Sequence, residues 1–199
     1  MERFDELKDM HRHLWNMLFQ ATVKRNHPMR TPVLATCSGT IPFVRTVVLR
    51  DVDTQSYQLF FFTDSRSDKV DQLRENEHMT SLFWDPGKKV QIRCRGKATL
   101  EQGTDRCREL WDQLNAAGRS SYAALMAPGT KVDEYTTGLP EGWSNNWPDD
   151  KTDAAFAHFM LLIQDVNEID GLHLEQNGHQ RALFTRRKDD NWDMSWLIP

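Results

Sequence analysis

Short runs of β-branched and aromatic residues, separated by polar turns, recur along the chain and limit the folds open to it. The expected strands are residues 33–36, 43–50, 57–63, 79–84, 89–100, 157–166, 171–174, 182–186 and 194–198. Apolar residues at helical spacing predict helices over residues 3–25, 67–76 and 104–118. Because helices and strands do not alternate regularly, we expect a mainly antiparallel β-barrel in an α+β fold, and not a parallel doubly wound sheet.

Size and charge narrow the class of protein. The 199 residues fit one domain, residues 1–199, and the net charge of −4 argues against binding nucleic acid through bulk positive charge. The apolar runs, such as Leu59–Phe62 and Met160–Ile163, are short and far below the roughly 20 residues that a membrane span needs. The first residues are charged and lack the apolar stretch of a secretory signal. The three cysteines are scattered, so we expect them to be free thiols. We therefore expect a cytoplasmic protein without a nucleic-acid or membrane partner.

Several common functional signatures are missing from the sequence. It contains no glycine-rich dinucleotide or P-loop motif, no GxSxG and no HExxH. The seven histidines are not paired at metal-ligand spacing, so we expect no metal site.

The most informative segment runs from Phe60 to Lys69, where an apolar strand ends, a polar turn follows and a helix begins. Helix N-termini attract anions, and arginine and lysine side chains add charge-assisted bonds to a phosphate. The segment therefore predicts an anion site. The alternative is a capping box, in which Ser65 caps the helix and Asp68 lies three residues on.

Two strands carry further candidate ligand residues. In the segment from Arg45 to Arg50, arginines flank an apolar centre, and their five-residue separation places them on opposite faces of a regular strand. In residues 89–97, polar and mostly basic side chains alternate with apolar ones. Gln91 is the best ligand candidate there, whereas Arg93, Arg95 and Lys97 are typical of a charged outer barrel face.

These segments, taken in order, resemble the pyridoxamine 5'-phosphate oxidase-like family of FMN-binding split barrels. The resemblance extends to the C-terminal His179-Gln180-Arg181 segment and the residues from Trp192 to Pro199. It implies an FMN-binding split barrel, an antiparallel Greek-key-type β-barrel with flanking helices, that acts as an oxidoreductase on a small molecule. It also implies a homodimer, and Trp143 and Trp147 in the loop of residues 128–153 have the composition of interface anchors.

The resemblance assigns roles to particular residues. The expected phosphate ligands are Thr63, Arg66, Ser67 and Lys69, and the expected remainder of the cofactor pocket is Arg45, Thr46, Val48, Arg50, Phe62, Gln91 and Arg181. The expected substrate residues are Arg50, Arg119, Ser121 and His179. No catalytic base is assigned, because flavin chemistry can proceed through placement of the substrate alone.

The sequence also departs from the family pattern. Asn177 stands two residues before His179, where true oxidases of this family carry a substrate-binding arginine, and Asp68 precedes Lys69 where they carry a second cation. These departures argue against a vitamin B6 compound as the substrate, and the expectation of an FMN cofactor is unchanged. The alternatives are a protein on the same scaffold that holds flavin or haem without turnover, and a plain interaction domain.

Overall fold

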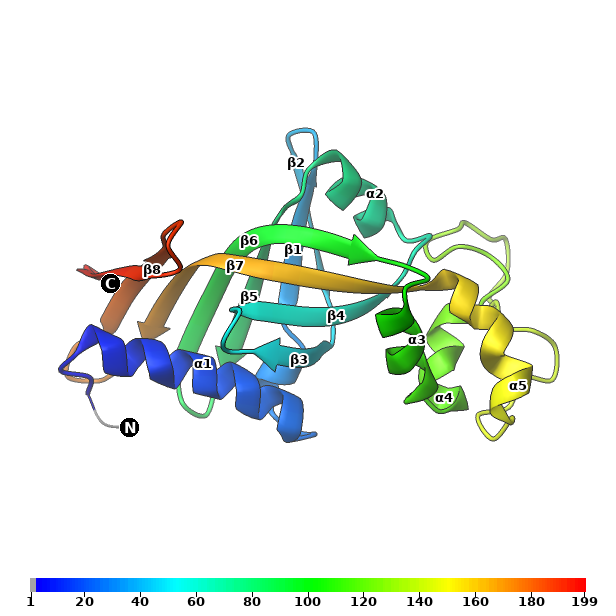
Figure 1. The fold of residues 1–199 in the computed structure, drawn as a ribbon, viewed down its shortest axis with the longest axis horizontal. Helices are drawn as coiled ribbons and strands as arrows, with labels where there is room; N and C mark the ends of the chain where they lie inside the picture. The colour runs from blue at the N-terminus through cyan, green and yellow to red at the C-terminus, as the bar shows by residue number, and fades with distance from the viewer. Residues whose placement is uncertain (1–2) are drawn as a thin grey trace.

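The computed structural model describes residues 3–199 as nine antiparallel strands with helices at both ends of the sheet (Figure 1). The strands are β1 (Val33–Ser38), β2 (Ile41–Thr46), β3 (Leu49–Asp53), β4 (Gln58–Asp64), β5 (His78–Asp85), β6 (Val90–Glu101), β7 (Phe159–His173), β8 (Gln180–Arg186) and β9 (Trp192–Leu197). The α-helices are α1 (Leu7–Val23), α2 (Asp68–Glu75), α3 (Asp105–Asp112), α4 (Ala116–Arg119) and α5 (Asp149–Thr152). Short 3-10 turns lie at Pro28–Arg30, Ser120–Tyr122 and Asp153–His158.

Strand β7 organises the sheet, because it is long enough to pair with three others. Its first half pairs with β4 and its second half with β8, while β6 follows almost its whole length on the other side. The sequence predicts two strands here, residues 157–166 and 171–174, and the structure joins them. A bulge between Arg95 and Gly96 accommodates the bend, and a Cβ at Gly96 would lie 1.9 Å from the carbonyl oxygen of Asp165.

Strands β2 and β3 lie at the two ends of the pairing order β2-β1-β5-β6-β7-β4-β3. They are consecutive in the chain, so the corner at residues 47–48 connects opposite edges of the sheet. The prediction of one strand over residues 43–50 is therefore wrong. Val47, just past β2, still donates its backbone N–H to the carbonyl of Pro32 in the register of the β1–β2 pair, and the chain crosses to β3 only after it. Arg45 and Arg50 consequently lie on different strands.

Helix α1 closes one side of the barrel, as the long helix below the sheet in Figure 1 shows. Met10, Leu14, Trp15 and Leu18 are buried in the main core against the inward side chains of the strands. A Cβ at Gly171 would lie 2.4 Å from the Leu14 side chain, so only glycine at this position of β7 lets α1 pack closely.

A second core holds the helical insert of residues 102–158 against the outer faces of β4 and β7. Phe159 packs there on Trp111 and Tyr122, and Phe60 belongs to the same buried cluster. The predicted helix over residues 104–118 begins as expected, with Thr104 accepting from the N–H of Cys107. It then breaks after Asp112 into α3 and α4.

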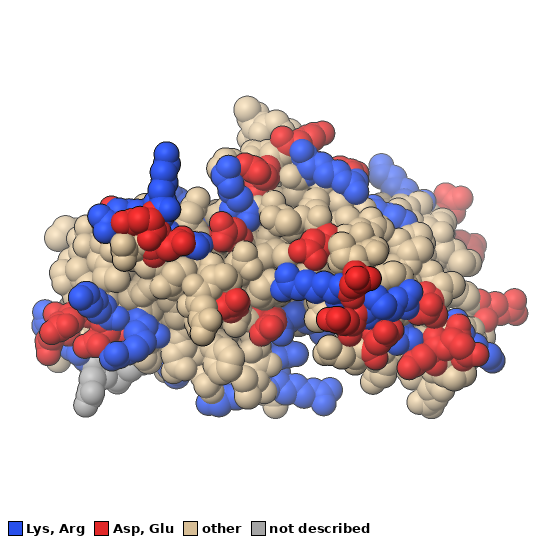
Figure 2. Space-filling view, in the orientation of Figure 1, with Lys and Arg blue, Asp and Glu red and all other residues tan. Residues whose placement is uncertain are grey.

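The fold class predicted from the sequence is confirmed: a mainly antiparallel split barrel with flanking helices. That the whole chain is one domain stays a prediction. Lys, Arg, Asp and Glu side chains intermingle over the visible face, with acidic residues most numerous toward the insert (Figure 2). Cys37, Cys94 and Cys107 are free. No helix within residues 3–199 is long and apolar enough to span a membrane.

Candidate functional site

The turn between β4 and α2 gathers hydroxyl groups around one lysine. Lys69 Nζ donates to Thr63 Oγ1 at 2.9 Å and to Ser67 Oγ at 2.8 Å, and both hydroxyl residues are buried. The alternative interpretation of this segment as a Ser65 capping box is wrong, because α2 begins at Asp68 and Ser67 holds the N-cap position. The Ser67 hydroxyl donates to the carbonyl of Asp64 and leaves the first N–H groups of α2 without a side-chain cap.

A second cation, Arg45, reaches this turn from β2. Its guanidinium donates to Thr36 on β1 and, at 2.9 Å, to Gln72 Oε1 on α2. Thr36 and Gln72 are themselves buried and joined by a hydrogen bond of 2.5 Å. This buried pair fixes the direction of the arginine.

Arg45 and Lys69 lie close enough to influence each other. Burial lowers the pKa of Lys69, and the charge of Arg45 lowers it further, partly offset by Asp64 and Asp68. Burial also lowers the pKa of Arg45. Neither cation has a carboxylate oxygen within 4.0 Å in the part of the chain that the structure describes. Two partly desolvated cations without a paired acid make a site that an anion would stabilise.

Arg66 has a different environment from the one predicted. Its guanidinium donates two hydrogen bonds, of 3.0 and 2.7 Å, to the buried carboxylate of Asp64, and this pairing raises the pKa of Arg66. The ion pair compensates the Asp64 carboxylate, which also accepts from the Arg66 backbone N–H at 2.8 Å. In this conformation Arg66 supports the turn, and its charge is already neutralised.

The other predicted residues near the turn fall into two groups. Thr46 is exposed at the end of β2, and Val48 lies in the corner that follows it. Arg50, near the start of β3, stacks over Phe62, with 5.1 Å from its guanidinium carbon to the ring centroid. Its Nε is buried without a hydrogen-bond partner among the described residues.

Arg50 and Phe62 open onto a cavity of about 390 Å³ between β3, β4 and α3. Arg30 and Arg106 also line it, against a single acid, Asp51. No pattern in the sequence marks Arg30 or Arg106, because they join the cavity only through tertiary contacts. The cavity combines a cationic rim with an apolar floor.

Gln91 and Arg181 lie at the other end of the sheet. Gln91 on β6 and Arg181 on β8 both pair with Leu172 on β7, so their side chains lie on the same face of the sheet. The Arg181 guanidinium donates to the Asp170 carboxylate at 3.0 and 2.8 Å. Thr63 pairs instead with Met160, twelve residues earlier on β7. At about 3.3 Å per residue this separation is roughly 40 Å. One chain therefore does not bring Gln91 and Arg181 together with Lys69.

The predicted substrate residues are scattered. His179 lies in the turn before β8, where its Nδ1 accepts from the N–H of Glu175 at 3.1 Å, and Ser121 is exposed on the insert. The structure corrects the prediction that Arg119 binds substrate. Arg119 is 1% exposed and donates to Trp111 O, Asp149 O and Thr152 Oγ1. Because its guanidinium is enclosed and engaged, Arg119 holds the insert together and offers no surface to a substrate.

Sequence reasoning missed Thr36 and Gln72. Gln72 carried a signal, since it lies three residues after Lys69 and so shares its helix face. Thr36 carried none, because only the β1–β2 pairing brings it beside Arg45. No cluster of three or more potential metal ligands occurs among residues 3–199.

Comparison with known proteins gives consistent matches. Residues 12–102 match the model of the pyridoxamine 5'-phosphate oxidase FMN-binding domain. The pyridoxine/pyridoxamine 5'-phosphate oxidase of Psychrobacter sp. (strain PRwf-1) is 26% identical over 178 residues, covering 83% of this chain and 78% of that protein.

Two solved structures share the whole fold. A pyridoxamine 5'-phosphate oxidase-related, FMN binding protein from Nostoc punctiforme PCC 73102 matches with a TM-score of 0.73 and 23% identity, over 100% of both chains. PhzG from Burkholderia lata 383, in complex with tetrahydrophenazine-1-carboxylic acid, matches with a TM-score of 0.72 and 19% identity, over 100% of this chain and 98% of that one.

The fold and the cationic turn after β4 define a flavin-binding split barrel. The residues present fit the phosphate end of the cofactor, because Arg45 and Lys69 supply two cations that lack paired acids among the described residues. Over residues 12–102 the chain matches the FMN-binding domain of the pyridoxamine 5'-phosphate oxidase family, to which it is similar as a divergent relative, and its cofactor is FMN.

Proposed function

We propose that the protein is an FMN-dependent oxidoreductase that acts on a small organic anion. The observation that carries this proposal is the pair of partly buried cations, Arg45 and Lys69, beside the buried hydroxyls of Thr63 and Ser67. Bound FMN supplies two-electron redox chemistry, and the protein supplies position, charge and exclusion of water.

The proposed roles follow from the contacts. Lys69, Thr63 and Ser67 bind the FMN phosphate, and Arg45 faces it from β2. Arg66 stabilises the turn through Asp64 and acts on the phosphate only indirectly. Thr46 and Val48, at the corner between β2 and β3, line the flavin.

The substrate class is suggested by the cavity beside Arg50. A ligand there meets Arg50, Arg30 and Arg106 around an apolar floor that includes Phe62. A small molecule with an apolar body and a carboxylate or phosphate group suits this combination. The B. lata structure of the same fold holds a carboxylic acid, which is consistent with that class.

A homodimer explains the distribution of the remaining site residues. Gln91, Arg181 and His179 are separated from Lys69 by most of the length of β7, which is visible as the long central strand of Figure 1. A second copy of the chain can supply them to the same flavin. Trp84, paired with Gln91 and 43% exposed, gives this outer face an apolar anchor.

The flavin and its turnover are tested together by spectroscopy. The purified protein is expected to show flavin absorption bands that a candidate electron donor bleaches and air restores. Bound flavin that no donor reduces would favour the alternative of a non-catalytic flavin-binding protein. Colourless protein that fails to bind added FMN would contradict the proposal.

The dimer is tested by light scattering of the FMN-loaded protein. We expect twice the chain mass of 23.2 kDa. Trp84→Glu is expected to give monomers that also lose FMN affinity. A monomeric wild type that binds FMN tightly would contradict a shared site. A cytoplasmic location and a single domain over residues 1–199 stay predictions.

A further inference from the structure

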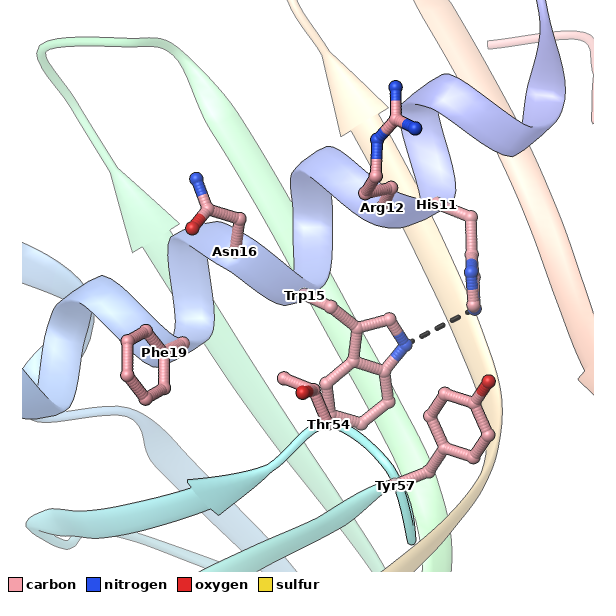
Figure 3. Close-up of a pocket in the computed structure, with 7 residues that line it drawn as sticks. All are labelled: His11, Arg12, Trp15, Asn16, Phe19, Thr54 and Tyr57. Carbon is pink, nitrogen blue, oxygen red and sulfur yellow. Dashed lines mark hydrogen bonds between the residues drawn. The ribbon is translucent and has the colours of Figure 1, made fainter.

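A pocket between α1 and the turn from β3 to β4 lies apart from the flavin site (Figure 3). Its volume is about 450 Å³. Tyr57, on one wall, precedes β4, whereas Thr63 lies near the end of that strand. The six-residue separation corresponds to about 20 Å along the strand, so the pocket is distinct from the phosphate turn.

Aromatic rings form the inner wall of this pocket. Trp15 and Tyr57 lie with ring centroids 5.3 Å apart, and Phe19, one helical turn beyond Trp15, is 41% exposed at the edge. The Trp15 indole N–H donates to His11 Nε2 at 3.1 Å, as the dashed line in Figure 3 marks. His11 is therefore a neutral acceptor at this point and contributes no charge to the pocket.

Tyr57 adopts a left-handed backbone conformation, with φ of 59°. This region is unfavourable for a bulky side chain, and a hairpin turn would be made more easily with glycine or asparagine. The surroundings hold it there: Tyr57 O accepts from the N–H of Val166 at 3.0 Å, and Arg186 stacks over the ring. The turn thus presents an aromatic ring to the pocket at a backbone cost that the turn alone does not require.

The rim is polar but has almost no net charge. Arg12 lines it and pairs with Asp9 at 2.7 Å, and none of the described residues that line the pocket is acidic. The amide of Asn16 and the hydroxyl of Thr54 make no hydrogen bond to another side chain in the part of the chain the structure describes. They are available to a ligand.

We propose that this pocket binds a neutral, planar heteroaromatic ring. The ring packs against Tyr57, Phe19 and the accessible edge of Trp15, and its hydrogen-bonding edge meets Thr54, with Asn16 at the outer rim. Pockets of a few hundred Å³ with apolar aromatic walls and a few polar groups are the usual form of small-molecule sites. Packing a charged ring on the aromatic wall costs desolvation energy that the one lining cation, the exposed Arg12 already paired with Asp9, does not repay, so the pocket selects against ionised rings.

The experiment uses the full chain loaded with FMN, and nicotinamide as the probe. Nicotinamide is titrated at millimolar concentrations while the indole N–H resonances are followed by NMR, with Trp15 assigned by its loss in Trp15→Phe. Nicotinate, which differs mainly in its negative charge, is the matched ligand control. We expect nicotinamide to shift the Trp15 resonance saturably, and nicotinate to bind at least about tenfold more weakly, or 1.4 kcal/mol.

A pair of helix variants locates the site. Asn16→Tyr fills the pocket from an exposed position, so it leaves the fold intact and is expected to abolish the Trp15 shift. Lys8→Tyr, also exposed on α1 but outside the pocket, is expected to leave it unchanged. No Trp15 shift with nicotinamide, equal binding of nicotinate, or an undiminished shift in Asn16→Tyr would each overturn the proposal.

Discussion

Gln72 Oε1 accepts hydrogen bonds from both Arg45 Nη2, at 2.9 Å, and Thr36 Oγ1, at 2.5 Å. This buried amide oxygen joins β1, β2 and α2 at one point. It orients Arg45 without neutralising it, because an amide carries no formal charge. The cation thus remains available for the FMN phosphate that we propose Lys69 also binds.

Gln72→Glu tests this arrangement with opposite effects on stability and binding. A carboxylate at this position would pair with Arg45 and stabilise the FMN-free protein, but it would repel the phosphate. We expect FMN affinity to fall by about tenfold or more while the midpoint of urea unfolding rises. Affinity is measured by quenching of flavin fluorescence. Unchanged affinity in a folded Gln72→Glu protein would remove Arg45 from the phosphate site.

Lys69→Ala is expected to weaken FMN binding with little effect on folding. Charge-assisted hydrogen bonds are worth about 1.5–3 kcal/mol each, which corresponds to about 10- to 150-fold in affinity. The double variant Lys69→Ala with Arg66→Ala is expected to lose FMN, with an added loss of stability because Asp64 is left unpaired. Arg74→Ala, exposed on the same helix, is the control. Equal FMN affinity in Lys69→Ala and Arg74→Ala would contradict the assignment.

The protein is expected to lose stability as the pH falls from 6.5 to about 4 because of His11. Burial lowers the pKa of His11 from 6.5 to about 4. The unfolded chain therefore binds a proton in this window and the folded chain does not, so the loss is complete below the folded pKa. The shift corresponds to about 3 kcal/mol at most.

The measurement is urea unfolding at pH 7 and pH 4. His11→Gln keeps an acceptor for the Trp15 indole and is expected to show a smaller pH-dependent loss than wild type. His78→Gln, at an exposed position, should behave as wild type. If His11→Gln and wild type lose equal stability, His11 is not the group responsible.

Arg119→Met is expected to reduce stability and leave FMN affinity unchanged. The substitution removes donors from Trp111 O and Thr152 Oγ1 inside the insert, at a cost of about 2 kcal/mol or more. Chemical denaturation and an FMN titration measure the two effects, with exposed Ser121→Ala as the control. A fully stable Arg119→Met protein would argue against a structural role for this arginine.

We expect poor oxidation of pyridoxamine 5'-phosphate. Asn177 cannot form the charged, bidentate contact of an arginine, and losing such a contact costs about 2–4 kcal/mol, or roughly 30- to 1000-fold in the specificity constant. Gly178, with φ of 116°, also fixes a tight turn beside it. The assay is steady-state turnover with hydrogen peroxide detection on FMN-loaded protein. Efficient turnover would make the Asn177 departure irrelevant.

The sequence predicted which residues of the candidate site lie together where they are local in the chain, whereas their binding to phosphate stays a prediction. Thr63, Ser67 and Lys69 were recognisable because one strand, turn and helix hold them within seven residues. The course of residues 43–50 was not predictable, because Val47 and Val48 have strong strand propensity and only barrel closure breaks the strand there. The burial of Arg119 was equally hidden, since it depends on packing of α4 against α3 and against Asp149, 30 residues after Arg119.

The most direct test of the phosphate site compares FMN with riboflavin, which lacks the phosphate. If Arg45 and Lys69 bind that group, FMN binds the wild-type protein at least about 100-fold more tightly, since two charge-assisted contacts contribute about 3 kcal/mol or more. The preference should collapse in Lys69→Ala. Isothermal titration of the flavin-free protein with each ligand gives both constants. Equal affinity for FMN and riboflavin would contradict the assignment of the phosphate to these two cations.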